Sequence, residues 1–162
     1  MTLVLGIDPG PANNGYAVLD FTIPGAPVWH HGGVTGDVER VLDWLSREGE
    51  PLRPRLVVVE QARALHNPMA NIQAMGTAWA GGCAFGMARA RGYDVRAVGV
   101  NEWRIALVGR SKKGDNVDEK VKTFLATFVR QFPTRTNNHA RDAAGVACAG
   151  FRMWQAGWGE SH

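Results

Sequence analysis

Four side chains in this 162-residue sequence have the types and positions expected of a divalent-cation site. Asp8 follows the apolar run TLVLGI, and Glu60 follows the largely apolar run PRLVVV. In open α/β sheets, functional side chains gather at the carboxyl ends of strands, so these carboxylates meet if their strands are neighbours. His139 and Asp142 stand three residues apart in TRTNNHARDAAGVACAG and would share one helix face. Carboxylate oxygens and one imidazole suit Mg²⁺ or Mn²⁺.

Each of these four residues also has an ordinary structural interpretation. Asp8 stands before a Pro-Gly turn sequence, and Glu60 could pair with an arginine such as Arg63 or Arg141. Asp142 in a first helical turn is favoured by the helix dipole, and His139 is compatible with a surface position. Taken singly, the structural interpretation is favoured for each residue. Taken together, two strand-terminal carboxylates and a His-x-x-Asp pair favour a metal site.

The hydrophobic pattern predicts one α/β domain over residues 1–162. Apolar and alternating runs predict strands at 2–8, 15–21, 26–34, 54–61 and 93–100. Helical periodicity predicts helices at 35–48, 69–91, 101–109, 117–132 and 138–154, with Thr35 and Asn101 as N-caps of the first and third. The unbroken runs in strands 2–8 and 54–61 are typical of strands buried on both faces of a sheet.

The segment 67–88 carries no formal charge and is long enough to span a bilayer. It contains several polar residues that are costly in hydrocarbon, which favours a buried helix of a soluble protein. Its glycines would each lower helix stability by up to about 1 kcal/mol relative to alanine. Two explanations stay open, a homodimer interface or close packing on the sheet. The glycines concerned are Gly76, Gly81, Gly82 and Gly86.

Charge and cysteine content restrict the class of protein. The net charge of +3 suggests an acidic partner, and all four lysines fall between positions 112 and 122. This lysine window is either an electrostatic feature or a solvated helix face. Cys83 and Cys148 have no metal-binding spacing, which favours a cytoplasmic protein in a reducing compartment. The amino-terminal residues lack the basic flank of a signal peptide.

Three motifs, in this order, resemble those of the RuvC-type Holliday-junction resolvases of the ribonuclease H-like nuclease superfamily. They are LGIDPG, VVVEQ and HARDAAGVA, and the resemblance extends from residue 3 to about residue 150. It implies a ribonuclease H-like α/β fold, with a central five-stranded mixed sheet flanked by helices and the long helix at a homodimer interface. It also implies an enzyme, a crossover junction endodeoxyribonuclease that resolves four-way DNA junctions by paired symmetric nicks.

The resemblance also implies roles for the four candidate residues. Asp8 would bridge two metal ions, Glu60 would bind one of them and Asp142 the other. His139 stands where many family members have a further aspartate. The implied cofactor is Mg²⁺, two per active site, with Mn²⁺ able to substitute. Two such cations hydrolyse a phosphodiester without a covalent intermediate, and the expected ends are a 5′-phosphate and a 3′-hydroxyl.

With junction DNA as the implied partner, the lysine window becomes a phosphate-binding surface. The candidates are Lys112, Lys113, Lys120 and Lys122, with Arg63, Arg135 and Arg141 as further candidates near the proposed site. Gly114 stands where the family usually has a lysine, and the loop QARALHNPM after Glu60 lacks the aromatic residue that many members carry.

Alternative functions remain open from the sequence. One is a nuclease for RNA–DNA hybrid or structured RNA, and another is a catalytically silent junction-binding protein. The sequence also leaves open whether a branch-migration helicase is a partner and which DNA sequence is cut.

Overall fold

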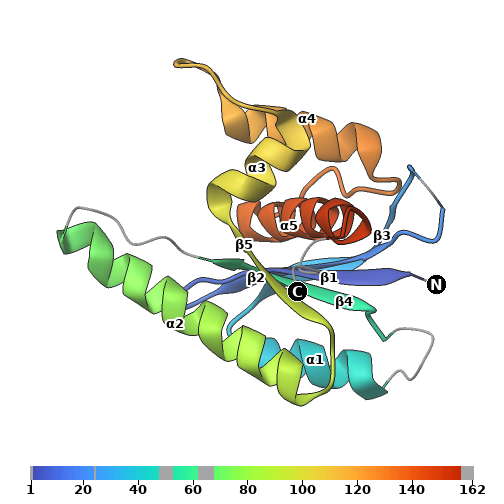
Figure 1. The fold of residues 1–162 in the computed structure, drawn as a ribbon, viewed down its shortest axis with the longest axis vertical. Helices are drawn as coiled ribbons and strands as arrows, with labels where there is room; N and C mark the ends of the chain where they lie inside the picture. The colour runs from blue at the N-terminus through green and yellow to red at the C-terminus, as the bar shows by residue number, and fades with distance from the viewer. Residues whose placement is uncertain (1, 24, 48–52, 62–67, 158–162) are drawn as a thin grey trace.

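The computed structural model describes residues 2–23, 25–47, 53–61 and 68–157, and these ranges contain a five-stranded mixed sheet (Figure 1). The strand order is β3-β2-β1-β4-β5. β2 pairs antiparallel with both β1 and β3, whereas β4 pairs parallel with both β1 and β5. The predicted mixed sheet is therefore confirmed. Its strands are β1 (Leu3–Asp8), β2 (Asn14–Asp20), β3 (Val28–Thr35), β4 (Leu56–Gln61) and β5 (Val95–Gly99).

Helices cover both faces of this sheet. Figure 1 shows one pair on one face, and on the other face a helix lying against the sheet with two more beyond it. No helix in the described ranges is both long and apolar enough to cross a bilayer. The first pair is α1 (Val38–Arg47) and α2 (Pro68–Ala90), the helix against the opposite face is α5 (Asn138–Gln155), and the outer two are α3 (Val100–Val108) and α4 (Val117–Phe128).

Two hydrophobic cores follow from the alternation of side chains along the strands. In β1, Leu3, Leu5 and Ile7 pack with residues of α1 and α2, whereas Val4 packs with residues of α5. All four side chains are fully buried. In β4, Val58 faces α5 in the same way. The central strands are thus buried on both faces, as their unbroken apolar runs predict.

The helix α5 lies close to β1 and β2 because glycines stand at the contact points. A side chain at Gly6 would collide with the carbonyl oxygen of Ala143 in α5. A side chain at Gly15 would collide with the backbone of His139. On the helix, Ala143 and Ala147 are fully buried. Small residues on both elements therefore bring the first turn of α5 over the carboxyl end of β1.

Two helix starts differ from the prediction. α1 begins at Val38, and its first turn is capped by Asp37, which accepts a hydrogen bond from the Glu39 amide at 2.9 Å. Thr35 instead ends β3 and bonds the Asp37 amide at 3.0 Å. Asn101 lies inside α3, which follows β5 without a loop and has Gly99 as its N-cap.

The end of α4 also differs from the prediction. The helix stops at Phe128, four residues before the predicted boundary at 132. Beyond it, the Arg130 amide donates to the Pro27 carbonyl at 2.8 Å, and the Arg130 carbonyl accepts from the Trp29 amide at 2.9 Å. Pairing with the start of β3 therefore replaces the last helical turn. Local periodicity contains no sign of this distant partner.

The close approach of α5 predicts a large effect for Gly6→Ala. The added methyl group collides with the backbone of Ala143, which cannot move aside without lifting α5 from the sheet. We expect a loss of about 3 kcal/mol or more in the free energy of unfolding, measured by urea denaturation. Gly36→Ala is the control, because its nearest non-local atom, Ala12 O, would lie at an ordinary 3.6 Å. Equal stability of the two variants would contradict this packing.

Candidate active site

The carboxylates of Asp8 and Glu60 meet at one edge of the sheet. β1 and β4 are parallel neighbours, and Ile7 pairs with Val59. The next residue of each strand is the acidic one. Because Ile7 and Val59 face α1 and α2, the alternation of side chains turns both carboxylates towards α5. The condition on which the two carboxylates were expected to meet, that their strands are neighbours, is therefore fulfilled. Both carboxylates lie largely buried at the strand ends beneath the first turn of α5.

The first turn of α5 adds an imidazole to this edge. Asn137 is the N-cap of α5, and its side chain accepts a hydrogen bond from the His139 amide at 2.8 Å. The His139 Nδ1 atom lies 2.7 Å from Asp8 Oδ2. The side chain of His139 is 48% exposed, whereas that of Asp8 is 12% exposed. His139 is therefore the solvent-side partner of a nearly buried carboxylate.

Glu60 has a partner that sequence reasoning missed. The indole Nε1 of Trp103 donates a hydrogen bond to Glu60 Oε2 at 2.6 Å, and Trp103 is fully buried. Burial, followed by the neighbouring carboxylates of Asp8 and Asp142, raises the pKa of Glu60 to about 7. The hydrogen bond from Trp103 and the charge of Arg104 act in the opposite direction but do not offset the burial.

Asp142 is held by two arginines. The guanidinium of Arg141 contacts Asp142 Oδ1 through Nε at 3.0 Å and Nη2 at 2.9 Å. Arg104 Nη2 lies 3.7 Å from Asp142 Oδ2 and 3.1 Å from Asp118 Oδ1 of α4. Arg104 therefore links α3 to α4 and α5 at the site. Its Nε atom is buried and has no hydrogen-bond partner in the described ranges.

Trp103 and Arg104 are consecutive residues of NEWRIALVG, directly after the apolar strand β5. β5 is parallel to β4 and ends at the same edge of the sheet. The rule that points to Asp8 and Glu60 therefore also applies to the first turns of α3. The position of Trp103 and Arg104 just after a strand is therefore the sequence signal that could have marked them as site residues. The sequence cannot show, however, that a buried tryptophan and a carboxylate 43 positions apart would meet.

Burial also raises the pKa of Asp8, although its hydrogen bond and charge interaction with His139 oppose this. The site thus gathers three carboxylates, two of them with raised pKa values, which is a concentration of negative charge that a cation would relieve. Within the described ranges, no three His, Cys, Asp or Glu side chains converge so as to hold a metal ion as they stand. The donor types suit Mg²⁺ or Mn²⁺, but the carboxylates are each engaged by a protein partner.

The predicted DNA-binding residues fall into three groups. Lys112 and Lys113 are exposed in the loop before α4, and Arg135 is exposed before α5. Lys120 and Lys122 form ion pairs at 2.7 Å with Asp115 and at 3.6 Å with Glu119. Arg141 is engaged with Asp142, and Arg63 lies outside the described residues.

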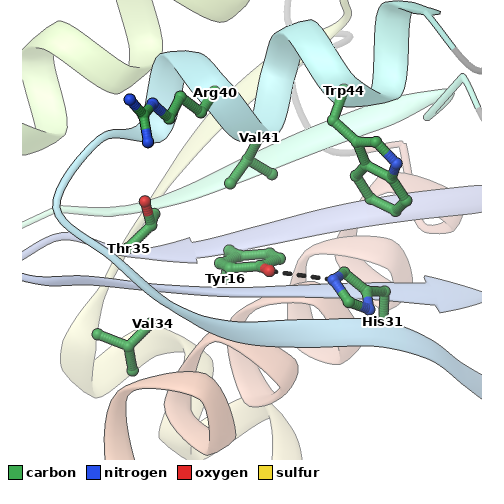
Figure 2. Close-up of a pocket in the computed structure, with 7 residues that line it drawn as sticks. All are labelled: Tyr16, His31, Val34, Thr35, Arg40, Val41 and Trp44. Atoms are coloured by element: carbon green, nitrogen blue, oxygen red, sulfur yellow. Dashed lines mark hydrogen bonds between the residues drawn. The ribbon is translucent and has the colours of Figure 1, made fainter.

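Two of the cavities in the described part of the chain differ in their position relative to the acidic site. One, of about 330 Å³, is next to the acidic site and has Arg104, Arg110 and Ser111 in its lining. The other, of about 310 Å³, lies between β3 and α1, where Tyr16 bonds His31 at 3.1 Å and Trp44 stands above them (Figure 2). Because Tyr16 packs with the core on the α1 side, this second cavity is on the face away from Asp8. Of these two, the first adjoins the carboxylates.

The raised pKa of Glu60 predicts a pH-dependent stability without divalent cations. Between pH 4.5 and about 7, the folded protein retains a proton that the unfolded chain releases, so Glu60 destabilises the fold increasingly as pH rises through this window. In EDTA at pH 8, Glu60→Gln should raise the free energy of unfolding by roughly 1–3 kcal/mol, and below pH 4.5 it should not. Glu119→Gln, at an exposed position, should have little effect at either pH. A lower stability of Glu60→Gln at pH 8 would contradict the charge crowding.

Similarity to known proteins agrees with this geometry. No family model matches the chain. It is 32% identical over 158 residues to the crossover junction endodeoxyribonuclease RuvC of Methylococcus capsulatus, covering 91% of this chain and 88% of that protein. The fold matches T. thermophilus RuvC in complex with Holliday junction substrate with a TM-score of 0.80, 25% identity and 98% of each chain covered.

Another solved structure, the yeast mitochondrial Holliday junction resolvase Ydc2, has the same fold at 13% identity, with a TM-score of 0.60 over 96% of this chain and 81% of that one. The match to the Methylococcus protein covers 91% of this chain at 32% identity. The chain therefore belongs to the RuvC family of crossover junction endodeoxyribonucleases.

Proposed function

We propose that this protein is a structure-selective DNA endonuclease that resolves four-way junctions by paired symmetric nicks. The observation that carries the proposal is the meeting of Asp8, Glu60, His139 and Asp142 at one sheet edge in a chain of the RuvC family. The structural match to a RuvC bound to junction DNA supports the choice of a four-way junction over an RNA–DNA hybrid.

The proposed chemistry is hydrolysis of a phosphodiester with Mg²⁺, two ions per site, or with Mn²⁺ in its place. Asp8 would be the shared ligand, with Glu60 on one side and Asp142 on the other, and His139 would be a further ligand or hold Asp8. When bound, such cations supply an activated water and neutralise charge on the attacking and leaving oxygens. The products would be a 5′-phosphate and a 3′-hydroxyl.

Protein groups would prepare this site before a cation arrives. His139 orients Asp8 through a 2.7 Å contact, and Trp103 orients Glu60 through a 2.6 Å hydrogen bond. Arg104 and Arg141 compensate the charge of Asp142. Neutral imidazole binds metal and imidazolium does not, so acid should weaken a site that uses His139 as a ligand.

DNA contacts would come from basic groups around this edge. The cavity beside Arg104, with Arg110 and Ser111 in its lining, has the size and polarity to accept a backbone phosphate. Lys112 and Lys113 are exposed in the adjoining loop and would add contacts. Such contacts make affinity fall steeply with salt. Arg141 is better suited to holding Asp142 than to contacting phosphate, since only 12% of its side chain is exposed.

The outer face of α2 supports a homodimer. Met75 and Trp79 are 71% and 77% exposed, and Gly82 and Gly86 have no non-local atom within 4 Å of a built Cβ. These residues recur at helical spacing and share one face. By contrast, Gly76 and Gly81 pack against Pro11 and Pro9 of the loop after β1, at 3.1 and 3.3 Å from a built Cβ.

The glycine-rich helix α2 is therefore compatible with both explanations of its glycines, packing within the chain and a homodimer interface. Two of its glycines allow close packing within the chain, and two lie on the face proposed for a second copy. Two copies would present two acidic sites, as paired nicks require. A cytoplasmic location agrees with the two free cysteines, Cys83 and Cys148. A branch-migration helicase as a further partner rests on the family resemblance alone.

Asp8→Asn tests the activity. Loss of the shared carboxylate should reduce cleavage of a labelled synthetic four-way junction by about a thousandfold or more, while junction binding in a gel-shift assay changes little. Asp20→Asn, at the opposite end of the same pair of strands, should cleave like the wild type. Wild-type cleavage by Asp8→Asn would contradict the site.

The same assay decides between the functions. Cleavage of a four-way junction but not of linear duplex or RNA–DNA hybrid in Mg²⁺ supports the proposal. Preference for the hybrid would favour the ribonuclease alternative. Tight junction binding without nicks in either Mg²⁺ or Mn²⁺ would favour a silent binding protein.

Trp79→Arg tests the dimer. A charge at this exposed apolar position of α2 should raise the dimer dissociation constant by about tenfold or more, as measured by sedimentation equilibrium. Ile23→Arg is the matched control, because Ile23 is also exposed, at 47%, but lies away from α2. A monomeric wild type, or equal dissociation constants for both variants, would exclude the α2 interface.

A further inference from the structure

We propose that Trp103 is a positioning residue for Glu60, holding this carboxylate in the orientation in which it binds a divalent cation. The inference rests on the proposed function of Glu60 as a metal ligand and adds a residue that the recognised motifs do not contain. It assigns to α3 a role in arranging the site, although α3 supplies no acidic ligand of its own.

The first support is the geometry of the hydrogen bond. Nε1 of Trp103 lies 2.6 Å from Glu60 Oε2, at the short end for a donor to a carboxylate. The indole has one N–H donor, so this bond uses its whole polar capacity. It engages one carboxylate oxygen directly. A carboxylate beside other carboxylates would otherwise turn away from them, and the bond opposes that rotation.

The second support is that the indole itself is held rigidly. Trp103 is fully buried. Gly145 of α5 lies against its ring, because a Cβ built at that position would be 2.7 Å from Cζ3 of the indole. On another side, the guanidinium of Arg104 lies 5.3 Å from the ring centroid. A ring enclosed in this way cannot swing, so its N–H has a fixed direction.

The third support is the position of Trp103 within α3. The helix follows β5 without a loop, and β5 is hydrogen-bonded to β4, the strand that ends in Glu60. The position of Trp103 is therefore fixed relative to the backbone of Glu60 by the pairing of β5 with β4. The next residue of the same helix, Arg104, forms an ion pair with Asp142 at 3.7 Å. One turn of α3 thus engages two of the three carboxylates.

If Trp103 only filled the core, its indole N–H would not need to contact Glu60. A phenylalanine would fill much of the same space between Gly145 and the sheet, without donating to a carboxylate. The short contact with Glu60 is what distinguishes the tryptophan. Groups that orient metal ligands in this manner typically change metal affinity by about 10- to 100-fold when they are removed.

The test is Trp103→Phe, which keeps a buried aromatic ring and removes the N–H. We expect Mn²⁺ to bind the DNA-free variant roughly tenfold more weakly, as measured by calorimetry, and the half-saturating Mn²⁺ concentration for junction cleavage to rise to match. Cleavage at saturating Mn²⁺ should recover most of the wild-type rate. Trp154→Phe is the matched control, because its N–H also bonds a carboxylate, Asp94, at 3.2 Å, away from the site.

A second variant covers the outcome in which Trp103→Phe does not fold. Benzothienylalanine incorporated at position 103 keeps the shape of the fused ring and replaces the N–H with sulfur, and the same loss of Mn²⁺ affinity is expected. Affinities within twofold of the wild type in the folded variants would overturn the positioning role.

The binding measurement separates this inference from the proposed function. Weaker Mn²⁺ binding by the variants, in a protein that cuts no junction, would uphold the positioning role and refute the activity. Normal Mn²⁺ binding by the variants, in a protein that cleaves junctions, would refute the positioning role and uphold the activity. Absence of Mn²⁺ binding by the wild type would overturn the positioning role directly.

Discussion

The close packing of α5 on β1 is the constraint on which the site depends. Backbone meets backbone at Gly6 and Ala143, with no room for a side chain between them. This contact sets the height of the first helical turn above the sheet, and so it determines that His139 reaches Asp8 at 2.7 Å. A thicker layer of side chains would leave Asp8 and Asp142 too far apart to act together. The apolar cores on both faces of the sheet then hold this spacing in place.

The affinity of this site for a cation follows from the crowding of three carboxylates in a largely buried position at the sheet edge. Three acidic side chains come from three elements that only the tertiary fold brings together, and each has its own partner: His139 for Asp8, Trp103 for Glu60, and arginines for Asp142. These partners reduce the cost of burying negative charge without removing it, as the pKa of Glu60 near 7 indicates. A site prepared in this way favours a cation and gives it oxygen ligands whose directions are already limited.

Much of this arrangement was predictable from the sequence, because strong periodic signals lie at the elements that matter. The runs before Asp8 and Glu60 predict buried strands that end in carboxylates, and the spacing of His139 and Asp142 predicts one helix face, as observed. The partners were not predictable in the same way. Trp103 resembles an ordinary core residue until its distance to Glu60 is known, and α4 ends early because Arg130 pairs with a strand a hundred positions away. Long-range contacts of this kind have no local pattern.

The central claim is that Asp8, Glu60 and Asp142 form one cation site at the sheet edge, and a crystal structure with Mn²⁺ tests it most directly. Crystals of the wild type with an uncleavable four-way junction, with data collected at the manganese absorption edge, would locate the ions by anomalous scattering. We predict two manganese peaks per subunit, with Asp8 contacting both, Glu60 one and Asp142 the other. Manganese bound elsewhere on the protein, or no ordered manganese at these carboxylates, would contradict the account.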